Sequence, residues 1–241
     1  ARALAALPDD SGCGARAVEA LTRPHGAPPR VIAEVKFRSP SAGVIRASAP
    51  GEGMRVAEGY VRGGASAVSV LADGPGFGGS PLGVRRVARA VDVPVLFKEF
   101  VIDEVQVDLA RAMGASMVLL LVRILPRARL DALVEAVHAR GMEPVVEAAD
   151  AREVEVAAAT KARIIGVNAR DLRSFRVDTE AAARALEGIP AGRVAVFMSG
   201  IRTPTDLRAV AETRADAVLV GEGLMRHETP GERLREMLEA L

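Results

Sequence analysis

The stretch Val95-Leu96-Phe97-Lys98-Glu99-Phe100 begins like a buried strand and ends in charged residues. Three other runs have the same form: Val31-Ile-Ala-Glu-Val-Lys36, Pro144-Val-Val-Glu147 and Ile164-Ile-Gly-Val-Asn168. A strand covered on both faces should be apolar throughout, because a charged side chain is costly to bury unless it is paired or faces a cleft. The repeated form therefore predicts that charged and polar side chains gather around one pocket.

These four runs belong to a set of eight short apolar runs, which alternate with segments whose apolar residues recur at helical spacing. We expect strands at residues 31–37, 67–72, 94–98, 117–123, 144–148, 164–168, 194–198 and 217–221. Such alternation predicts parallel strands with right-handed crossovers. Eight units match an α/β fold of the closed (βα)8 TIM barrel type, which usually has about 250 residues. A doubly wound open sheet is the competing arrangement.

Helix signals fill the intervals between these strands. Apolar residues at helical spacing predict helices over 103–113 and over 128–140, and Gly141 is a good stop for the second. Thr203-Pro204 and Thr229-Pro230 each combine a capping residue with proline at the first helical position. We therefore expect helices to begin at both places.

No linker-like or low-complexity stretch interrupts the alternation, so we expect one domain over residues 1–241. Of the 241 residues 49% are apolar, which is enough for one large core. Residues 1–30 precede the barrel, residues 31–241, as an N-terminal helical extension. This extension would either cover the bottom of the barrel or fold over its mouth.

Composition and charge narrow the classes of partner. The formal net charge is +1 with dispersed Lys and Arg, so no strong field recruits nucleic acid. The single cysteine, Cys13, excludes an intrachain disulfide, and residues 1–14 lack the pattern of a signal peptide. The apolar stretch 117–122 is far shorter than the ~20 residues of a membrane span. We expect a cytoplasmic monomer or weak homodimer without a membrane or nucleic-acid partner.

The candidate site lies at one end of the expected barrel. In a (βα)8 barrel the active site forms at the carboxyl ends of the strands. Six polar or small residues stand at these ends: Lys36, Lys98, Glu147, Asn168, Ser199 and Gly221. The three histidines are dispersed, and their spacing to cysteine or acidic residues does not suggest a metal site.

Two glycine-containing turns follow the last two expected strands. In Ser199-Gly200 and Gly221-Glu222-Gly223, small residues let backbone N–H groups approach an anion, and a following short helix would add its positive end. Barrels often bind phosphate at this place, so we expect a phosphorylated small-molecule substrate here. The alternative is that these glycines only make tight turns.

Lys98 and Glu147 are the expected acid–base pair. Burial among apolar neighbours would lower the pKa of Lys98 and suit it to proton donation or Schiff-base chemistry. An apolar site would raise the pKa of Glu147 toward that of a general base. The structural alternative is a salt bridge inside the barrel mouth. Glu34 and Lys36 share one face of their strand and point either into the pocket or outward under the helices.

A glycine pattern raises a different function. Gly74-Pro-Gly76-Phe-Gly-Gly79 follows an expected strand and matches the G-x-G-x-x-G of nucleotide-dependent oxidoreductases. That fingerprint belongs directly after the first strand of its fold, whereas here two expected strands, 31–37 and 67–72, come before it. Pro75 and Pro81 also suit an irregular loop. We therefore do not favour dinucleotide binding.

Taken together, ordered motifs from about residue 31 to the C-terminus resemble the indole-3-glycerol phosphate synthase family. The matching stretches are Ile32-Ala-Glu-Val-Lys36, Ser39-Pro-Ser41 with Gly43, Phe77-Gly-Gly-Ser80, Pro94-Val-Leu-Phe-Lys98-Glu-Phe100, Val146-Glu147-Ala148, Gly166-Val-Asn168-Ala-Arg170-Asp-Leu172, Ser199-Gly-Ile201 and Val220-Gly-Glu-Gly-Leu-Met225. The resemblance implies a (βα)8 barrel with an N-terminal extension, acting without metal or organic cofactor. It also implies closure of the indole ring of 1-(2-carboxyphenylamino)-1-deoxyribulose 5-phosphate, with loss of carbon dioxide and water.

The resemblance also implies roles for single residues. Lys98 is the general acid at the substrate ketone, and Glu147 takes or passes on a proton during dehydration. Glu34, Asn168 and Lys36 complete the implied catalytic set: Glu34 and Asn168 would orient the amine and the hydroxyls, and Lys36, together with Ser39, would contact the carboxylate and the phosphate. The other implied residues bind the substrate or support the site. Arg170 would support the catalytic groups, Phe100 and Leu172 would hold the aromatic ring, and Ser199, Gly200 and Gly221, with Glu222 beside them, would bind the phosphate.

The chain departs from the family pattern at several positions. Met198 stands where the family usually has a carboxylate, and the other departures are Ala42, Phe97, Glu99 and Ala169. Losing the carboxylate at position 198 removes one anion from the pocket. This departure motivates the alternative of a diverged paralogue that binds a phosphorylated sugar or aryl ligand with reduced or altered catalysis. A sugar-phosphate isomerase or epimerase is a further alternative, which the Lys98, Glu147 and Asn168 set disfavours.

Overall fold

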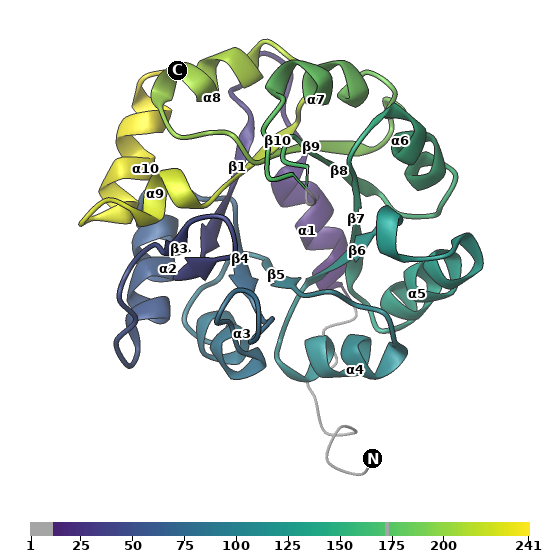
Figure 1. Ribbon diagram of the computed structural model, residues 1–241, viewed down its shortest axis with the longest axis horizontal. Coiled ribbons are helices and arrows are strands. Elements are labelled where there is room, and N and C mark those ends of the chain that lie inside the picture. The colour runs from purple at the N-terminus through teal and green to yellow at the C-terminus, as the bar shows by residue number, and fades with distance from the viewer. Residues whose placement is uncertain (1–11, 172–173) are drawn as a thin grey trace.

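The computed structural model describes residues 12–171 and 174–241. Eight parallel strands close into a barrel in the order β1-β10-β9-β8-β7-β6-β5-β4 (Figure 1). The barrel strands are β1 (Arg30–Val35), β4 (Ala67–Leu71), β5 (Val95–Lys98), β6 (Met117–Leu121), β7 (Glu143–Ala148), β8 (Ile164–Asn168), β9 (Val194–Met198) and β10 (Ala217–Val220). Every expected strand overlaps one of them, which confirms the (βα)8 TIM barrel. The closing pairs between β1 and β4 make the alternative of an open sheet wrong.

Helices that follow the strands surround the barrel (Figure 1). They are α2 (Glu52–Arg62), α3 (Pro81–Ala88), α4 (Glu104–Ala112), α5 (Arg127–Ala139), α6 (Ala151–Ala158), α7 (Thr179–Leu186), α8 (Pro204–Ala211), α9 (Glu222–Met225) and α10 (Pro230–Glu239). Shorter elements on the connections are a hairpin, β2 (Arg38–Ser39) and β3 (Gly43–Val44), and a 3-10 turn, η1 (Val122–Ile124). Among the described residues, no helix is long and apolar enough to cross a membrane.

The helix ends that the sequence predicted at Thr203, Gly141 and Pro230 are present in the structure. Thr203 caps α8 by accepting the N–H of Asp206, whose own side chain accepts the N–H of Thr203. Gly141 adopts a φ of +73° just after α5, a conformation that favours glycine. Pro230 begins α10 as expected, but the Thr229 side chain makes no capping hydrogen bond. Proline therefore sets the start of this helix without help from the preceding hydroxyl.

The described part of the N-terminal extension closes the bottom of the barrel. Helix α1 (Cys13–Leu21) begins where Gly14 donates its N–H to the carbonyl of Gly141 over 2.9 Å, next to the start of β7. Ala17 and Leu21 are buried in the apolar layer at this end of the barrel. For residues 12–30 the prediction that the extension covers the bottom is confirmed, and folding over the mouth is wrong. The described residues of the extension therefore leave the mouth uncovered.

Helices α2 and α10 pack backbone against backbone through glycines. A β-carbon on Gly231 would lie 2.2 Å from the carbonyl oxygen of Gly59, and one on Gly63 would lie 2.2 Å from that of Gly231. Because both obstacles are backbone atoms, a larger residue cannot be accommodated by a side-chain movement. Glycine is therefore required at this contact for steric reasons.

Candidate active site

The carboxyl ends of the barrel strands surround a cavity of about 130 Å³. The residues predicted for the site that line this cavity are Glu34, Lys36, Ser39, Lys98, Phe100, Glu147, Asn168, Arg170, Ser199, Gly200 and Glu222. Gly221 lies directly beside it, because a β-carbon there would fall 2.8 Å from Glu34 Oε1 and 3.2 Å from Lys36 Nζ. The predicted ring contact Leu172 lies outside the described residues.

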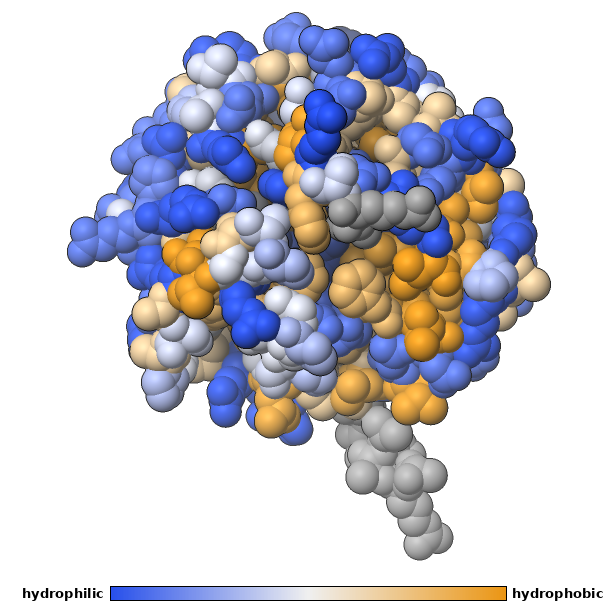
Figure 2. Space-filling model, viewed as in Figure 1, coloured by the Kyte–Doolittle hydropathy of each residue, from blue (hydrophilic) through white to orange (hydrophobic). Residues whose placement is uncertain are grey.

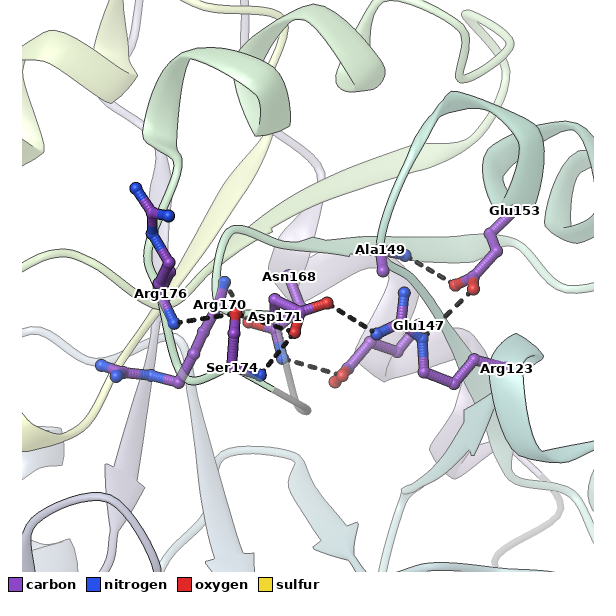
Figure 3. Close-up of polar contacts among 9 residues, drawn as sticks. All are labelled: Arg123, Glu147, Ala149, Glu153, Asn168, Arg170, Asp171, Ser174 and Arg176. Carbon is purple, nitrogen blue, oxygen red and sulfur yellow. Dashed lines mark hydrogen bonds and ion pairs between the residues drawn. The ribbon is translucent and has the colours of Figure 1, made fainter.

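Lys98, Glu147 and Asn168 form one hydrogen-bonded group at the ends of β5, β7 and β8. Lys98 Nζ donates to Glu147 Oε2 over 3.0 Å, and Asn168 Nδ2 donates to Glu147 Oε1 over 2.9 Å. The Asn168–Glu147 contact is drawn in Figure 3. The predicted salt bridge is thus present, and both of its members line the cavity. The structural and the catalytic interpretations of this pair are therefore compatible.

The environment of Lys98 differs from the predicted apolar one. Burial does act to lower the pKa of its ammonium, but the carboxylates of Glu147 and Glu34 outweigh burial and leave the pKa above its ordinary value. The prediction of a lowered pKa is therefore wrong, because it considered burial without these two anions. Glu147 is likewise not in an apolar setting, since both of its oxygens accept hydrogen bonds.

Glu34 and Lys36 both point into the cavity, so the outward alternative is wrong. Lys36 Nζ donates to Glu34 Oε1 over 2.6 Å, and Ser69 Oγ donates to Glu34 Oε2 over 3.2 Å. Burial acts to raise the pKa of the Glu34 carboxyl, but Lys36, Lys98 and the two hydrogen bonds prevail and hold it below its usual value. The wall of the cavity therefore contains two lysine–glutamate pairs.

The two predicted glycine turns lie together after β9 and β10. Ser199 and Gly200 adopt φ values of +71° and +85°. A side chain on Gly200 would crowd Thr179 and Val177, each about 3.0 Å from the β-carbon position. The Glu222 carboxylate stands at this end of the cavity and accepts hydrogen bonds from Arg226 at 3.0 and 2.9 Å. The positive φ values therefore favour small residues at Ser199 and Gly200, and the charge of Arg226 partly neutralises the Glu222 carboxylate.

Met198, which stands where the family usually has a carboxylate, is buried against the neighbouring strand. It is 1% exposed at the end of β9 and lines the cavity, and its methyl group would lie only 2.3 Å from a β-carbon on Gly166. The side chain therefore extends across Gly166 on the neighbouring strand, where a larger residue would displace it. A thioether in place of a carboxylate makes this part of the wall apolar.

Several residues that line the cavity or contact it were not predicted from the sequence, because no charged or polar residue at a strand end marks them. The cavity wall also includes Leu119, Leu121 and Leu219, together with Phe77 and Phe175 from the loops. The sequence does not distinguish the three leucines, because β6 and β10 are apolar at every position and show no alternation. Ser69, the partner of Glu34, lies in mid-strand, where a small polar residue is not distinctive.

The loop that carries the glycine pattern 74–79 forms a side wall of the cavity. Asp73 Oδ2 accepts the N–H groups of Gly76 and Phe77 at 2.7 and 2.8 Å, which folds this segment into a compact turn. The turn follows the second strand of a closed barrel, which lacks the crevice where an open sheet binds a dinucleotide. The structure therefore supports the interpretation as an irregular loop.

The mouth is rimmed by exposed apolar side chains. Figure 2 views this face and shows orange side chains beside the mouth, in the region between α4 and α5. Exposed apolar residues of this region are Phe100, Ile102, Val105 and Ile124. Within residues 12–171 and 174–241, no group of three or more His, Cys, Asp or Glu is placed to hold a metal ion.

Comparisons with known proteins agree with this geometry. A family model described as "Indole-3-glycerol phosphate synthase" matches residues 15–237. "Indole-3-glycerol phosphate synthase 2" of Streptomyces coelicolor is 47% identical over 209 residues, covering 86% of this chain and 80% of that protein. Indole-3-glycerol phosphate synthase of Micrococcus luteus is 45% identical over 206 residues, covering 86% of this chain and 76% of that protein.

Solved structures with little sequence identity support the fold alone. A crystal structure of KGPDC from Streptococcus mutans aligns with a TM-score of 0.64 at 11% identity, covering 88% of this chain and 96% of that one. Tryptophan synthase subunit alpha from Legionella pneumophila aligns with a TM-score of 0.65 at 16% identity, covering 88% and 92%. Both likenesses agree with the closed barrel.

Proposed function

The chain belongs to the indole-3-glycerol phosphate synthase family, and from this premise we propose how its cavity performs the reaction. The activity is that of a carboxy-lyase of tryptophan biosynthesis. One observation carries the proposal for the site: a partly buried lysine and a buried glutamate, joined over 3.0 Å, lie in the wall of a cavity with a glycine-containing turn of positive φ at one end. This arrangement suits acid–base chemistry on an anionic substrate.

The reaction forms one carbon–carbon bond and releases two small molecules. The ring carbon that bears the substrate carboxylate attacks the ketone carbon, and the ketone oxygen takes up a proton. The bond to the carboxylate then breaks, which releases carbon dioxide and restores the aromatic ring. Finally the new hydroxyl takes a second proton and leaves as water, while a neighbouring ring carbon loses a proton. The site must therefore supply an acid and a base.

Lys98 is the proposed acid. Its ammonium stays protonated at neutral pH because Glu147 and Glu34 raise its pKa, and it stands where negative charge can develop on the ketone oxygen. Glu147 is the proposed acceptor of the proton lost during dehydration. The 3.0 Å contact between them would let the proton taken by Glu147 return to Lys98. The reaction takes up two protons and returns one, so solvent would supply one further proton in each turnover. Asn168 holds the second oxygen of Glu147.

The remaining polar residues are proposed to orient the substrate. Glu34 would accept hydrogen bonds from the amine or the hydroxyls, and Lys36 would neutralise the carboxylate or the phosphate. The turns at Ser199-Gly200 and Gly221 would accept the phosphate through backbone N–H groups. Arg170 supports the catalytic amide through its own N–H, which donates to Asn168 Oδ1 over 3.0 Å.

The aromatic ring of the substrate is proposed to bind against the apolar part of the wall. Phe100 contributes one side of this region, and Phe77 lies near it with ring centroids 6.3 Å apart. Leu119 and Leu121 line the same cavity from β6. Apolar contact with the ring would bring its reacting carbon toward the ketone, which raises the rate by orientation.

The second candidate function is a diverged paralogue with reduced or altered catalysis, favoured by Met198 in place of a carboxylate. A fluorescence assay for indoleglycerol phosphate formed from the carboxyphenylamino-deoxyribulose phosphate decides between the two. Robust turnover would support the synthase and show that Met198 is tolerated. Thermal stabilisation by the substrate without turnover would favour the paralogue. Neither turnover nor stabilisation would contradict both.

Four broader properties are proposed from the sequence. The protein would fold as one domain, work in the cytoplasm as a monomer or weak homodimer, and have no nucleic-acid partner. The net charge of +1 and the single cysteine support this view. Light scattering on the eluting protein tests the oligomeric part, because a stable assembly larger than a dimer would contradict it.

A further inference from the structure

Arg123 is a partly buried arginine behind the proposed catalytic group, outside the wall of the main cavity. It belongs to η1, directly after β6, and its side chain is 19% exposed. A second, very small cavity of about 10 Å³ separates it from Glu147 and Asn168. That volume is close to the smallest that holds one water molecule. Arg123 is therefore near the catalytic side chains but does not face the substrate.

Arg123 joins the loops that follow two neighbouring strands. Its Nε donates to Glu153 Oε1 over 3.2 Å, and its Nη1 donates to Asp171 Oδ2 over 3.3 Å (Figure 3). Glu153 lies at the start of α6 and accepts the N–H of Ala149, just beyond β7, over 2.8 Å. One guanidinium thus connects the chain after β6 with the ends of β7 and β8.

Asp171 in turn folds the loop after β8. Its Oδ1 accepts the N–H of Ser174 over 2.7 Å, and its own N–H donates to the carbonyl of Arg176 over 2.9 Å. The same loop contributes Arg170 and Phe175 to the main cavity. Phe175 is held at a φ of +58°, a strained conformation for a residue with a side chain, which persists only where neighbouring contacts fix it.

The loop is connected to the catalytic group through one backbone hydrogen bond. The N–H of Arg170 donates to Asn168 Oδ1 over 3.0 Å, and this bond turns the amide so that Nδ2 points at Glu147. A displacement of the loop would release the amide, and Glu147 would lose the donor to its Oε1. Figure 3 shows these contacts as a continuous series from Arg123 to Glu147.

We infer that Arg123 is a positioning residue, which holds the loop after β8 and thereby fixes Asn168 and Glu147 for the reaction proposed above. The inference rests on the proposed function for its kinetic consequence only. Its structural part, the fixing of the loop by a guanidinium between two carboxylates, concerns the protein without substrate. Sub-ångström placement matters because a small error in the position of a catalytic group lowers the rate strongly.

The kinetic test compares Arg123→Met, Asp171→Asn and the double variant with the wild type. Each single variant should lower kcat about 10- to 100-fold with little change in KM, since Lys36, Ser199 and Gly200, the proposed contacts to the anionic groups of the substrate, lie outside the loop. The double variant should be no slower than the slower single variant, because both changes break the same contact. Arg123→Lys should recover part of the rate. Unchanged kcat, or effects that multiply, would overturn the inference.

A second measurement needs no activity. Hydrogen exchange followed by NMR should show the amides of Arg170 and Ser174 exchanging about 10-fold faster in Arg123→Met, because their acceptors become mobile. The matched control is Arg127→Met, which removes an arginine away from the site. Arg127 Nε donates to Asp131 Oδ2 over 2.7 Å, and its loss should leave the exchange of both amides unchanged. Equal exchange in Arg123→Met and wild type would overturn the inference. If the wild type shows no turnover but Arg123→Met still exchanges these amides faster than the wild type, only the proposed function is contradicted.

Discussion

Lys98 and Glu147 are 49 residues apart in the sequence, yet the ammonium of one donates to the carboxylate of the other over 3.0 Å. They meet because β5 and β7 end at the same rim of a closed barrel. The carboxylates of Glu147 and Glu34 keep the pKa of Lys98 above its ordinary value despite burial. An amine must be unprotonated to form a Schiff base, so this environment favours an acid over a nucleophile.

Replacing Lys98 by methionine should abolish most of the turnover. The aliphatic chain of similar length keeps the packing, whereas the proton donor is lost, so kcat should fall about 10²- to 10⁴-fold. Steady-state assays measure the rate, and circular dichroism with thermal unfolding checks the fold. Lys161→Met, which removes a lysine that is 75% exposed and pairs with Glu135 at the surface, is the control. Near-wild-type turnover of Lys98→Met would refute the assignment.

Glu147→Gln should slow the chemical step and leave substrate binding largely intact. The amide keeps the shape of the side chain but cannot take up the proton of the dehydration step. We expect kcat to fall about 10²-fold or more with KM within a few-fold of the wild type. Glu135→Gln, at a surface carboxylate, should behave like the wild type. A raised KM with unchanged kcat would instead make Glu147 a binding residue.

The ion pair at Glu34 should stabilise the fold in a pH-dependent way. The folded-state pKa of Glu34 lies below the ordinary value of 4.5, so the folded protein binds fewer protons there than the unfolded chain. Its contribution is therefore present above pH 4.5 and is lost as the pH falls through the folded-state value. The difference in unfolding free energy between wild type and Glu34→Gln should shrink on acidification. Urea unfolding at several pH values measures it, and a difference that grows toward low pH would contradict the prediction.

The glycine contact between α2 and α10 predicts a large effect of one methyl group. Gly231→Ala places a β-carbon 2.2 Å from the carbonyl oxygen of Gly59 and should destabilise the protein by about 1–3 kcal/mol. The control is Gly192→Ala, whose β-carbon would meet nothing within 4 Å and should change stability by less than about 0.5 kcal/mol. Urea unfolding compares the two variants. Equal stability of both would show that the helices separate at little cost.

The sequence predicted the barrel because its signals are local. Each strand is an apolar run bounded by turns, so all eight strands were located within a few residues of their ends. The helix stop at Gly141 and the cap at Thr203 depend on a few neighbouring residues, and both act as expected. Charged residues at strand ends predicted the position of the cavity, since a charged side chain inside a barrel is costly to bury unless it is paired or faces a cleft.

Only the tertiary structure decided which of these charges meet and what the meeting does to them. The pKa of Lys98 rises because two carboxylates from other strands outweigh burial, and the sequence does not state those distances. Arg123 and Asp171, 48 residues apart, are joined only because β6 and β8 flank β7 in the closed sheet. Secondary structure follows from short-range patterns, whereas electrostatic and positioning roles depend on contacts between residues distant in the chain. The sequence therefore determined the barrel and the rim on which the cavity lies, and barrel closure determined which charged side chains meet there.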